Sequence, residues 1–302
     1  MPWFVTSKEE NGATKHRFIT DCRVLNQYFC PKQLKLDNLN QILPFLRKNW
    51  WGVKVDLKDA YFHLRLAESL QPFLRMAVGE ELWEFQSACF GISTLPHTFM
   101  QLMKVLEKIW RKKGFLVFIY LDDILLLAPT EKQARSQVAV LVDTLLSAGF
   151  KINVKKSILE PTQEVVHLGM EINLKEGRLE VPSYKLKNIR KELEKLLKAQ
   201  FSTCRKMASI LGQVRSYLVA LPFLRLVTDE LAKFSNMHLS EGWDFKISIP
   251  EKLKTQLREL NELLVPGLWR PFFTEVHREL HSDSSTHAWG VGPSTGNYIQ
   301  EF

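Results

Sequence analysis

Residues 117–127 read VFIYLDDILLL, and this stretch poses the main question about the fold. Apart from Asp122 and Asp123, every residue in it is apolar or aromatic, as in buried β-strands. A buried carboxylate is costly unless a hydrogen bond, an ion pair or a bound cation compensates its charge, and two neighbours also repel each other. We therefore predict two paired strands joined by a tight turn with the aspartates at its tip. A plain hairpin turn is the alternative, since aspartate is a common turn residue.

A further carboxylate follows a second strand-like run, VKVDLKDAYFHL at 53–64. Asp56 stands at the end of this run, and Tyr61 comes five residues later. If the two strands are neighbours, their carboxylates form a site for two hard divalent cations, which bind oxygen ligands. Such ions activate an attacking hydroxyl group and stabilise a leaving phosphate oxygen. We expect Asp59 to serve only a local helix or turn.

Composition sets wide limits on function. The chain has 302 residues, 45% of them hydrophobic, which is enough for more than one domain. Its net charge of +8 is compatible with a polyanionic partner, although many soluble proteins are equally basic. The cysteines show no metal-binding spacing, which predicts reduced thiols in a reducing, intracellular compartment. We find no signal peptide and no apolar run of membrane-spanning length, so no membrane partner is expected.

Hydrophobic periodicity predicts a series of strands and helices. We expect a hairpin within 3–30, a helix over 37–49 capped by Asp37, a strand over 51–57, and helices over 97–111, 131–148, 183–200 and 202–221. The helix at 131–148 begins with a capping box of Thr130 and Gln133. An all-helical part therefore follows an α/β part, with a boundary near residue 180. Residues 241–278 look like a linker-like subdomain, and both ends of the chain look cut.

Six segments resemble, in order, the motifs of reverse transcriptases. They are KHRFITDCRVLNQ (15–27), VDLKDAYF (55–62), FGISTLPHTFMQLM (90–103), YLDD (120–123), LLSAGFKINVKKS (145–157) and VVHLGMEI (165–172). The resemblance covers about residues 4–175 and implies an α+β, right-hand polymerase fold. We expect fingers and a palm with an antiparallel sheet over 1–180, a helical thumb over 181–240, a connection over 241–278 and the beginning of an RNase H-like domain over 279–302.

The resemblance also implies a metal site. Asp56, Asp122 and the backbone carbonyl of Leu57 correspond to ligands of two Mg²⁺ ions, for which Mn²⁺ can substitute. Asp123 corresponds to the catalytic partner of Asp122. The reaction implied is template-directed synthesis of DNA on RNA, and also on DNA, by two-metal nucleotidyl transfer.

Several residues correspond to nucleotide-binding positions of the family. Arg17 and Lys8 would contact the triphosphate, with Lys15 as the alternative to Lys8. Tyr61 would exclude a ribose 2′-hydroxyl, and Gly91 would contact the template and the incoming nucleotide. The implied partners are deoxynucleoside triphosphates and a primer–template duplex of RNA or DNA. The lysine-rich face at 185–198 would follow the phosphates of that duplex, unless it is simply a solvated surface.

Two features concern the subgroup and the C-terminal part. Cys89-Phe90-Gly91 stands where retroviral enzymes have Pro-Gln-Gly, and this form resembles retrotransposons of the DIRS type. LHSDSSTHAWGVG (280–292) resembles the first strand of an RNase H domain, with Asp283 as its first metal ligand. A serine- and aspartate-rich turn is the alternative. Because the other carboxylates of such a site are missing from the sequence, we expect no RNase H activity.

Other functions stay open at this point. A catalytically silent remnant of a retroelement could keep the fold and bind nucleic acid or a protein. An RNA-dependent RNA polymerase is a more distant alternative, and Tyr61 and the lack of a Gly-Asp-Asp turn argue against it. The complete set of Asp56, Asp122 and Asp123 favours an active RNA-directed DNA polymerase of a retrotransposon.

Overall fold

The aspartates lie at one end of a four-stranded antiparallel sheet. In this computed structural model, which describes residues 1–10, 13–273, 280–284, 289–293 and 300–301, the sheet has the order β6-β7-β3-β8. Its strands are β3 (Trp51–Asp56), β6 (Leu116–Tyr120), β7 (Asp123–Ala128) and β8 (Ile158–Thr162). The predicted strand at 51–57 and the hairpin around YLDD are therefore confirmed.

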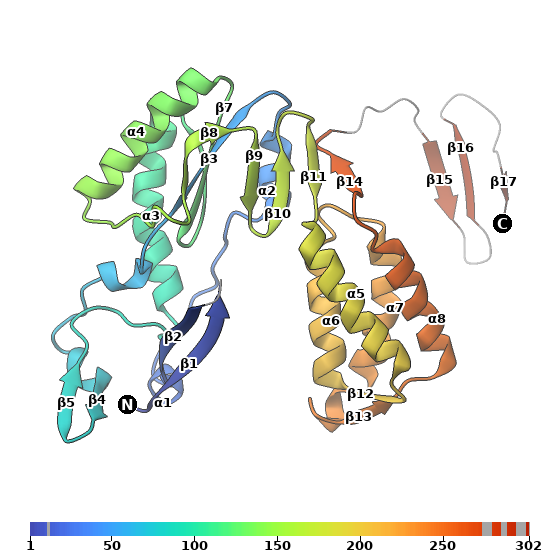
Figure 1. Cartoon of the computed structure of the whole chain (residues 1–302), viewed down its shortest axis with the longest axis horizontal. Helices are drawn as coiled ribbons and strands as arrows, with labels where there is room; N and C mark the ends of the chain where they lie inside the picture. The colour runs from blue at the N-terminus through green and yellow to red at the C-terminus, as the bar shows by residue number, and fades with distance from the viewer. Residues whose placement is uncertain (11–12, 274–279, 285–288, 294–299, 302) are drawn as a thin grey trace.

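Two long helices, α3 (Leu95–Lys112) and α4 (Glu131–Ser147), pack with this sheet (Figure 1). Side chains alternate along a strand, so Val53 and Val55 enter the buried cluster that includes Phe99 of α3. Both helices confirm the sequence prediction within a few residues. Thr130 accepts the N–H of Gln133, which forms one half of the predicted capping box.

Two hairpins and several short helical segments form the part that precedes and flanks this sheet (Figure 1). They are β1 (Trp3–Glu10) with β2 (Ala13–Thr20), β4 (Arg75–Val78) with β5 (Glu81–Glu84), α1 (Arg23–Asn26), η2 (Ala60–His63) and η3 (Gln71–Leu74). The first of these pairs confirms the hairpin predicted within 3–30.

The helix predicted over 37–49 is wrong in length and in its cap. The structure has α2 (Leu39–Ile42) followed by the 3₁₀ helix η1 (Leu43–Phe45). Pro44 ends the α-helical pattern because it has no backbone N–H and its ring displaces the preceding turn. Asn38 is the N-cap, in a capping box with Gln41. Asp37 instead accepts the backbone N–H of Ile119 at 3.1 Å, so it joins this segment to β6.

A second sheet lies between the β6-β7-β3-β8 sheet and the C-terminal helices (Figure 1). Its order is β14-β11-β10-β9, with β9 (Glu164–His167), β10 (Met170–Asn173), β11 (Arg178–Glu180) and β14 (Trp269–Pro271). Gly52 of β3 approaches this sheet closely, because a Cβ added there would lie 2.8 Å from a methyl group of Val165. Glycine thus allows β9 to pack against β3.

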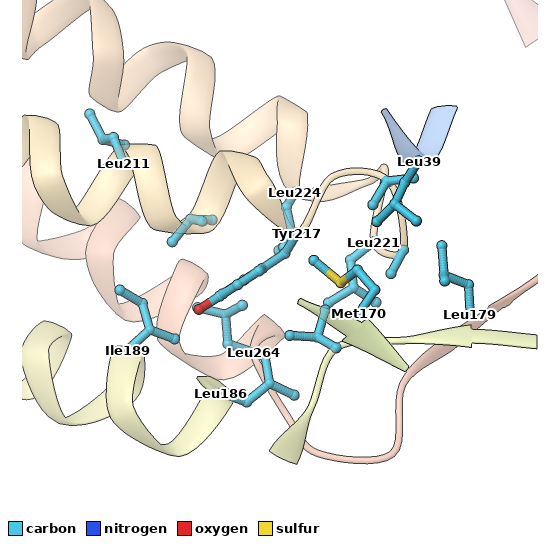
Figure 2. Close-up of a cluster of buried hydrophobic side chains, with 14 of the residues drawn as sticks. Leu39, Met170, Leu179, Leu186, Ile189, Leu211, Tyr217, Leu221, Leu224 and Leu264 are labelled. Atoms are coloured by element: carbon cyan, nitrogen blue, oxygen red, sulfur yellow. The ribbon is translucent and has the colours of Figure 1, made fainter. Parts of the chain in front are cut away.

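Four helices form the thumb-like unit: α5 (Ser183–Lys198), α6 (Cys204–Ser216), α7 (Leu224–Met237) and α8 (Glu251–Leu263). The short 3₁₀ segment η4 (Leu239–Glu241) follows α7, and β12 (Phe201–Thr203) pairs with β13 (Lys246–Ser248). Their buried side chains share one core with Met170 and Leu179 of the second sheet (Figure 2). The predicted connection over 241–278 stays a prediction, but its helix α8 packs against α5 and α7.

The last described strands are β15 (Leu280–Ser284), β16 (Trp289–Pro293) and β17 (Gln300–Glu301). The backbone of Asp283 lies in β15 opposite Gly290, while its side chain lies outside the described part of the chain. An RNase H-like role for Asp283 therefore stays a prediction. Among the described residues, no helix is both long and apolar enough to cross a membrane.

Candidate active site

The hairpin between β6 and β7 carries the Asp122–Asp123 pair at its tip. Tyr120 and Asp123 are opposite each other, which leaves Leu121 and Asp122 as a two-residue turn. Leu121 has a φ of 54°, a left-handed conformation that is costly for a leucine. On the other side of β7, Asp123 lies opposite Asp56 of β3. The fold therefore brings together carboxylates that are far apart in the sequence.

Backbone hydrogen bonds fix the relative positions of these segments. The N–H of Leu57 donates to the carbonyl of Asp122 at 2.9 Å. The N–H of Asp56 donates to the Ser157 hydroxyl at 2.9 Å, and the Asp56 carbonyl accepts the N–H of Asn153 at 2.8 Å. Asp56 is only 6% exposed. The segment 153–157, within the fourth motif, thus supports β3 at the point where its carboxylate lies.

The electrostatics of the site leave negative charge only partly compensated. Burial raises the pKa of Asp56, and the charges of Asp122 and Asp123 raise it further, while Lys156 acts in the opposite direction. Burial also raises the pKa of Asp122, and the neighbouring charge of Asp123 adds to this effect. A bound cation would relieve both contributions.

Asp123 is held differently from the other two aspartates. The ammonium of Lys54 lies 3.1 Å from its carboxylate, and both side chains are largely buried. Lys54 precedes Asp56 by two residues, so the two share one face of β3. Lys54 was not among the predicted site residues, although this spacing is a signal that could have found it.

The donor set fits a hard divalent cation. Within the described part of the chain, no group of three or more His, Cys, Asp or Glu residues is arranged to hold a metal ion. Besides burial, the charge of Asp122 raises the pKa of Asp56, so these two carboxylates lie near each other. Together with the carbonyl of Leu57 they would supply the predicted oxygen set of two carboxylates and one backbone group. Hard cations such as Mg²⁺ are commonly bound by one or two carboxylates and complete their coordination with water and substrate phosphates.

Tyr61 is located beside these carboxylates. Burial, and then the charge of Asp122, raise the pKa of its hydroxyl. Its ring lies between those of Phe90 and Phe99, at centroid distances of 5.2 and 5.5 Å. The side chain is therefore fixed in position next to the carboxylates.

Gly91 belongs to a loop that is bonded to α1 and packs against the end of β2. Its carbonyl accepts the side-chain amide of Asn26 at 2.9 Å. Its φ of 110° is favourable only for glycine, and a Cβ there would come 3.0 Å from the carbonyl oxygen of Thr20. The loop thus needs glycine for both conformation and space.

The triphosphate-binding residues can be located only by their backbone. Lys8 lies opposite Lys15, and Arg17 lies opposite Thr6, in the β1–β2 hairpin. The side chains of Lys8, Lys15 and Arg17 are outside the described part of the structure. Their proposed roles therefore stay predictions.

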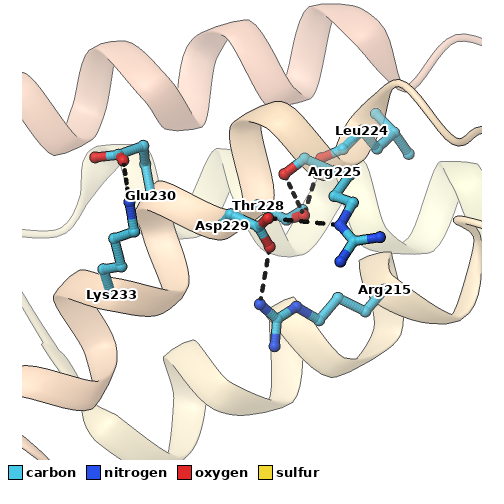
Figure 3. A network of polar contacts seen from close by, with 7 residues as sticks. All are labelled: Arg215, Leu224, Arg225, Thr228, Asp229, Glu230 and Lys233. Carbon is cyan, nitrogen blue, oxygen red and sulfur yellow. Dashed lines mark hydrogen bonds and ion pairs between the residues drawn. The ribbon is translucent and has the colours of Figure 1, made fainter. Parts of the chain in front are cut away.

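A cavity of about 770 Å³ lies next to the β6–β7 hairpin. Tyr120 and Leu168 line it, together with Arg215, Arg225 and Arg270 from the thumb-like unit and β14. Arg215 and Arg225 share one carboxylate, that of Asp229, at 3.2 and 3.6 Å (Figure 3). The wall of the cavity therefore carries an excess of positive charge. These arginines were not predicted from the sequence, because they are spread over 56 residues from Arg215 to Arg270 and follow no local pattern.

The lysine-rich helix α5 is more varied than its sequence suggested. Lys187, Lys191 and Lys198 are exposed, whereas Lys195 pairs with Glu192 at 3.0 Å. Lys185 is half-buried and donates to the carbonyl of Gly169 at 2.8 Å. Only part of this face is therefore free to meet phosphates.

Comparisons with known proteins agree with this geometry. Residues 7–172, slightly more than half of the chain, match the family described as "Reverse transcriptase (RNA-dependent DNA polymerase)". The chain is 26% identical over 285 residues to the Gag-Pol polyprotein of Walleye dermal sarcoma virus, covering 92% of this chain and 15% of the relative. It is 25% identical over 194 residues to Protein P of a duck hepatitis B virus (isolate white Shanghai duck S31), covering 60% of this chain and 24% of the relative. The chain thus spans less than half the length of these curated relatives.

A solved structure shows the same fold. The foamy viral protease–reverse transcriptase dRH in complex with double-stranded DNA superimposes with a TM-score of 0.69 at 18% identity, covering 99% of this chain and 50% of the other. The subgroup predicted from Phe90-Gly91 and the RNase H resemblance stay predictions. The family match over the region that contains Asp56, Tyr61, Gly91 and Asp122 decides the assignment, and the chain belongs to the reverse transcriptase family.

Proposed function

We propose that the chain catalyses RNA-directed DNA synthesis, and synthesis on DNA templates as well, with deoxynucleoside triphosphates as substrates. The observation that carries the proposal is the meeting of Asp56, Asp122 and Tyr61 within the part of the chain that matches the family. Members of this family use divalent metal ions. For this chain we propose two Mg²⁺ ions, with Mn²⁺ as a substitute.

The residues of the site would have different roles in nucleotidyl transfer. Asp56, Asp122 and the Leu57 carbonyl would hold the cations, which supply activation of the primer 3′-hydroxyl and neutralisation of the leaving pyrophosphate. Asp123, whose carboxylate pairs with Lys54, would add negative charge beside the cations and support the Leu121–Asp122 turn. The hydrogen bond from Leu57 to Asp122 keeps the two ligand segments in fixed proximity, and positioning of this kind is a large part of phosphoryl-transfer catalysis.

Tyr61 and Gly91 would select and seat the nucleotide. A ring that packs against those of Phe90 and Phe99 would fill the space of a 2′-hydroxyl, so it would exclude ribonucleotides by its bulk. Lys8 and Arg17 would hold the triphosphate through charge and, for arginine, paired donors.

The arginine-lined cavity supports binding of a primer–template duplex. Arg215, Arg225 and Arg270 add positive charge on the thumb side of Tyr120 and Leu168. Contacts of lysine and arginine with phosphates supply affinity without sequence preference and weaken with salt. Among the structural neighbours, one was solved in complex with double-stranded DNA and another, at a TM-score of 0.68 and 17% identity, in complex with an RNA/DNA hybrid.

Primer extension tests the proposal. The purified chain is given a labelled DNA primer on an RNA template, deoxynucleotides and Mg²⁺, beside the Asp122→Asn variant. We expect extension by the wild type only. If the wild type binds the duplex but extends nothing under varied metal and salt, the chain is a binding protein. Equal extension by the variant would refute the site assignment.

A further inference from the structure

We infer that Lys185 is a positioning residue, which holds the Leu168–Gly169 turn so that the turn presents the primer end to the catalytic aspartates. This inference rests on the proposed function and adds a residue of the thumb-like unit to the machinery. Among the hydrogen bonds of the described residues, only the one from Lys185 to Gly169 joins α5 to the turn between β9 and β10.

The turn itself has a demanding conformation. His167 and Met170 are opposite each other, so Leu168 and Gly169 form a two-residue loop. Their φ values are 47° and 77°, and both are left-handed. Turns with two left-handed residues suit paired strands, but glycine and asparagine are favoured there and a leucine is costly. The surroundings must therefore hold Leu168 in place.

Lys185 supplies that support from the first turn of α5. Its ammonium donates to the carbonyl of Gly169 at 2.8 Å, and its side chain is partly enclosed. A Cβ on Gly169 would overlap the ammonium, so the glycine leaves room for this bond. The next residues on both sides, Met170 and Leu186, lie in the same buried cluster (Figure 2). One polar bond and one apolar contact region thus join the turn to the thumb-like unit.

The position of the turn matters for the reaction. Leu168 lines the cavity next to Tyr120, and Tyr120 directly precedes the Leu121–Asp122 turn. A shift of Leu168 would therefore move whatever lies in the cavity relative to Asp122. Misplacement of a reacting group by about 1 Å can cost on the order of a hundredfold in rate.

A direct phosphate contact is the competing role for Lys185. Lys187 and Lys191, on the same helix, are exposed and suited to that role. The ammonium of Lys185 is instead already engaged by a backbone carbonyl, and burial lowers its pKa. These contrasts favour positioning over phosphate binding.

Three variants test the inference. Lys185→Met removes the ammonium and keeps most of the stem, Lys185→Arg restores a donor, and Lys233→Met, at an exposed lysine that pairs with Glu230, is the control. We measure duplex affinity by fluorescence anisotropy and the extension rate at saturating duplex and nucleotide. For Lys185→Met we expect the rate to fall by about tenfold or more, with less than about a threefold change in affinity, on the scale of a misplaced reacting group. Lys185→Arg should recover much of the rate.

A second readout does not need synthesis. A 2-aminopurine base at the primer 3′ end reports its stacking in the bound duplex, and we expect its fluorescence to change with Lys185→Met but not with Lys233→Met. If neither the rate nor the fluorescence differs between these variants, or if only affinity falls, the inference is overturned. A wild type that makes no DNA would refute the proposed function instead, and the fluorescence comparison would still decide the role of Lys185.

Discussion

Lys54 and Asp123 form an ion pair across β3 and β7, with the ammonium 3.1 Å from the carboxylate. This pair separates the roles of the three aspartates. Asp123 has a cation from the protein at contact distance, whereas burial and neighbouring carboxylates leave Asp56 and Asp122 with raised pKa values. These two carboxylates are the ones that the family resemblance implies as metal ligands.

We predict that Lys54→Met destabilises the protein and lowers the extension rate. Asp123 would remain largely buried without its partner, at a cost of about 1–3 kcal/mol, somewhat below the range for fully buried pairs. Urea unfolding gives the free energy of unfolding directly. Lys58→Met, at an exposed position nearby, is the control. Equal stability of the two variants would show that the pair contributes nothing.

Replacing either predicted ligand should separate activity from stability. Asp56→Asn and Asp122→Asn should reduce extension by about a hundredfold or more, the scale of losing one preorganised electrostatic group. Without metal, both variants should melt at a higher temperature than the wild type, because a neutral amide does not suffer the burial and repulsion that raise the pKa of these carboxylates. Asp143→Asn, at an exposed site, should change neither quantity.

The same pKa shifts predict the pH dependence. The ordinary pKa of both groups is 3.8 and the folded values are higher, so the folded state binds these protons more tightly. Without metal, the contribution of these two groups to stability should therefore be complete below pH 3.8 and be lost as the pH rises through the folded values. Extension needs the ionised forms, so its acid limb should lie above pH 3.8. A stability profile in which Asp122→Asn and wild type run parallel would contradict this assignment.

Local patterns predicted much of this arrangement, and their failures have physical causes. Strand alternation and the apolar flanks of Asp122 predicted the hairpin, because both are set by neighbours in the sequence. The cap at Asp37 could not be predicted, since that carboxylate bonds the backbone of Ile119, a partner 82 positions away. The cavity arginines were missed for the same reason, as they are brought together only by the tertiary fold. Lys54 was missed although its two-residue spacing from Asp56 is visible in the sequence, because its partner Asp123 lies on another strand.

Tyr61→Ala should let the enzyme use ribonucleotides. The ring is held between Phe90 and Phe99 beside Asp122, so its loss opens space where a 2′-hydroxyl would lie. We expect the ratio of kcat/KM for deoxynucleotides over ribonucleotides to fall by about tenfold or more, since one steric contact is worth about 1–3 kcal/mol of discrimination. Tyr61→Phe should keep the ratio, and Tyr28→Ala, at an 81% exposed residue, should not affect it. An unchanged ratio in Tyr61→Ala would refute the role.

The cavity arginines and the lysines of α5 can be ranked by salt dependence. If Arg215 and Arg225 contact phosphates, each change to methionine should lower the slope of log affinity against log salt by about one. Lys187→Met and Lys191→Met test the face predicted from the sequence in the same way. Lys233→Met is the control, because its ammonium pairs with Glu230 at 2.9 Å. Slopes that change only for the α5 variants would place the duplex on α5 rather than at the cavity.

His167 should make the protein acid-sensitive. It is fully buried in β9, and neither ring nitrogen has a hydrogen-bond partner among the described residues. Burial lowers its pKa from 6.5 to about 4, so the unfolded chain binds this proton more readily between these values. The contribution of His167 to stability is therefore complete above pH 6.5 and is lost as the pH falls through about 4, by up to about 3 kcal/mol.

His167→Phe should flatten the unfolding free energy between pH 6.5 and 4 relative to the wild type, and the exposed His16→Phe should not. Asp56 and Asp122 act in the opposite direction, so the decisive quantity is the difference in unfolding free energy between the wild type and His167→Phe at each pH. A difference that stays constant with pH would show that burial does not hold His167 neutral.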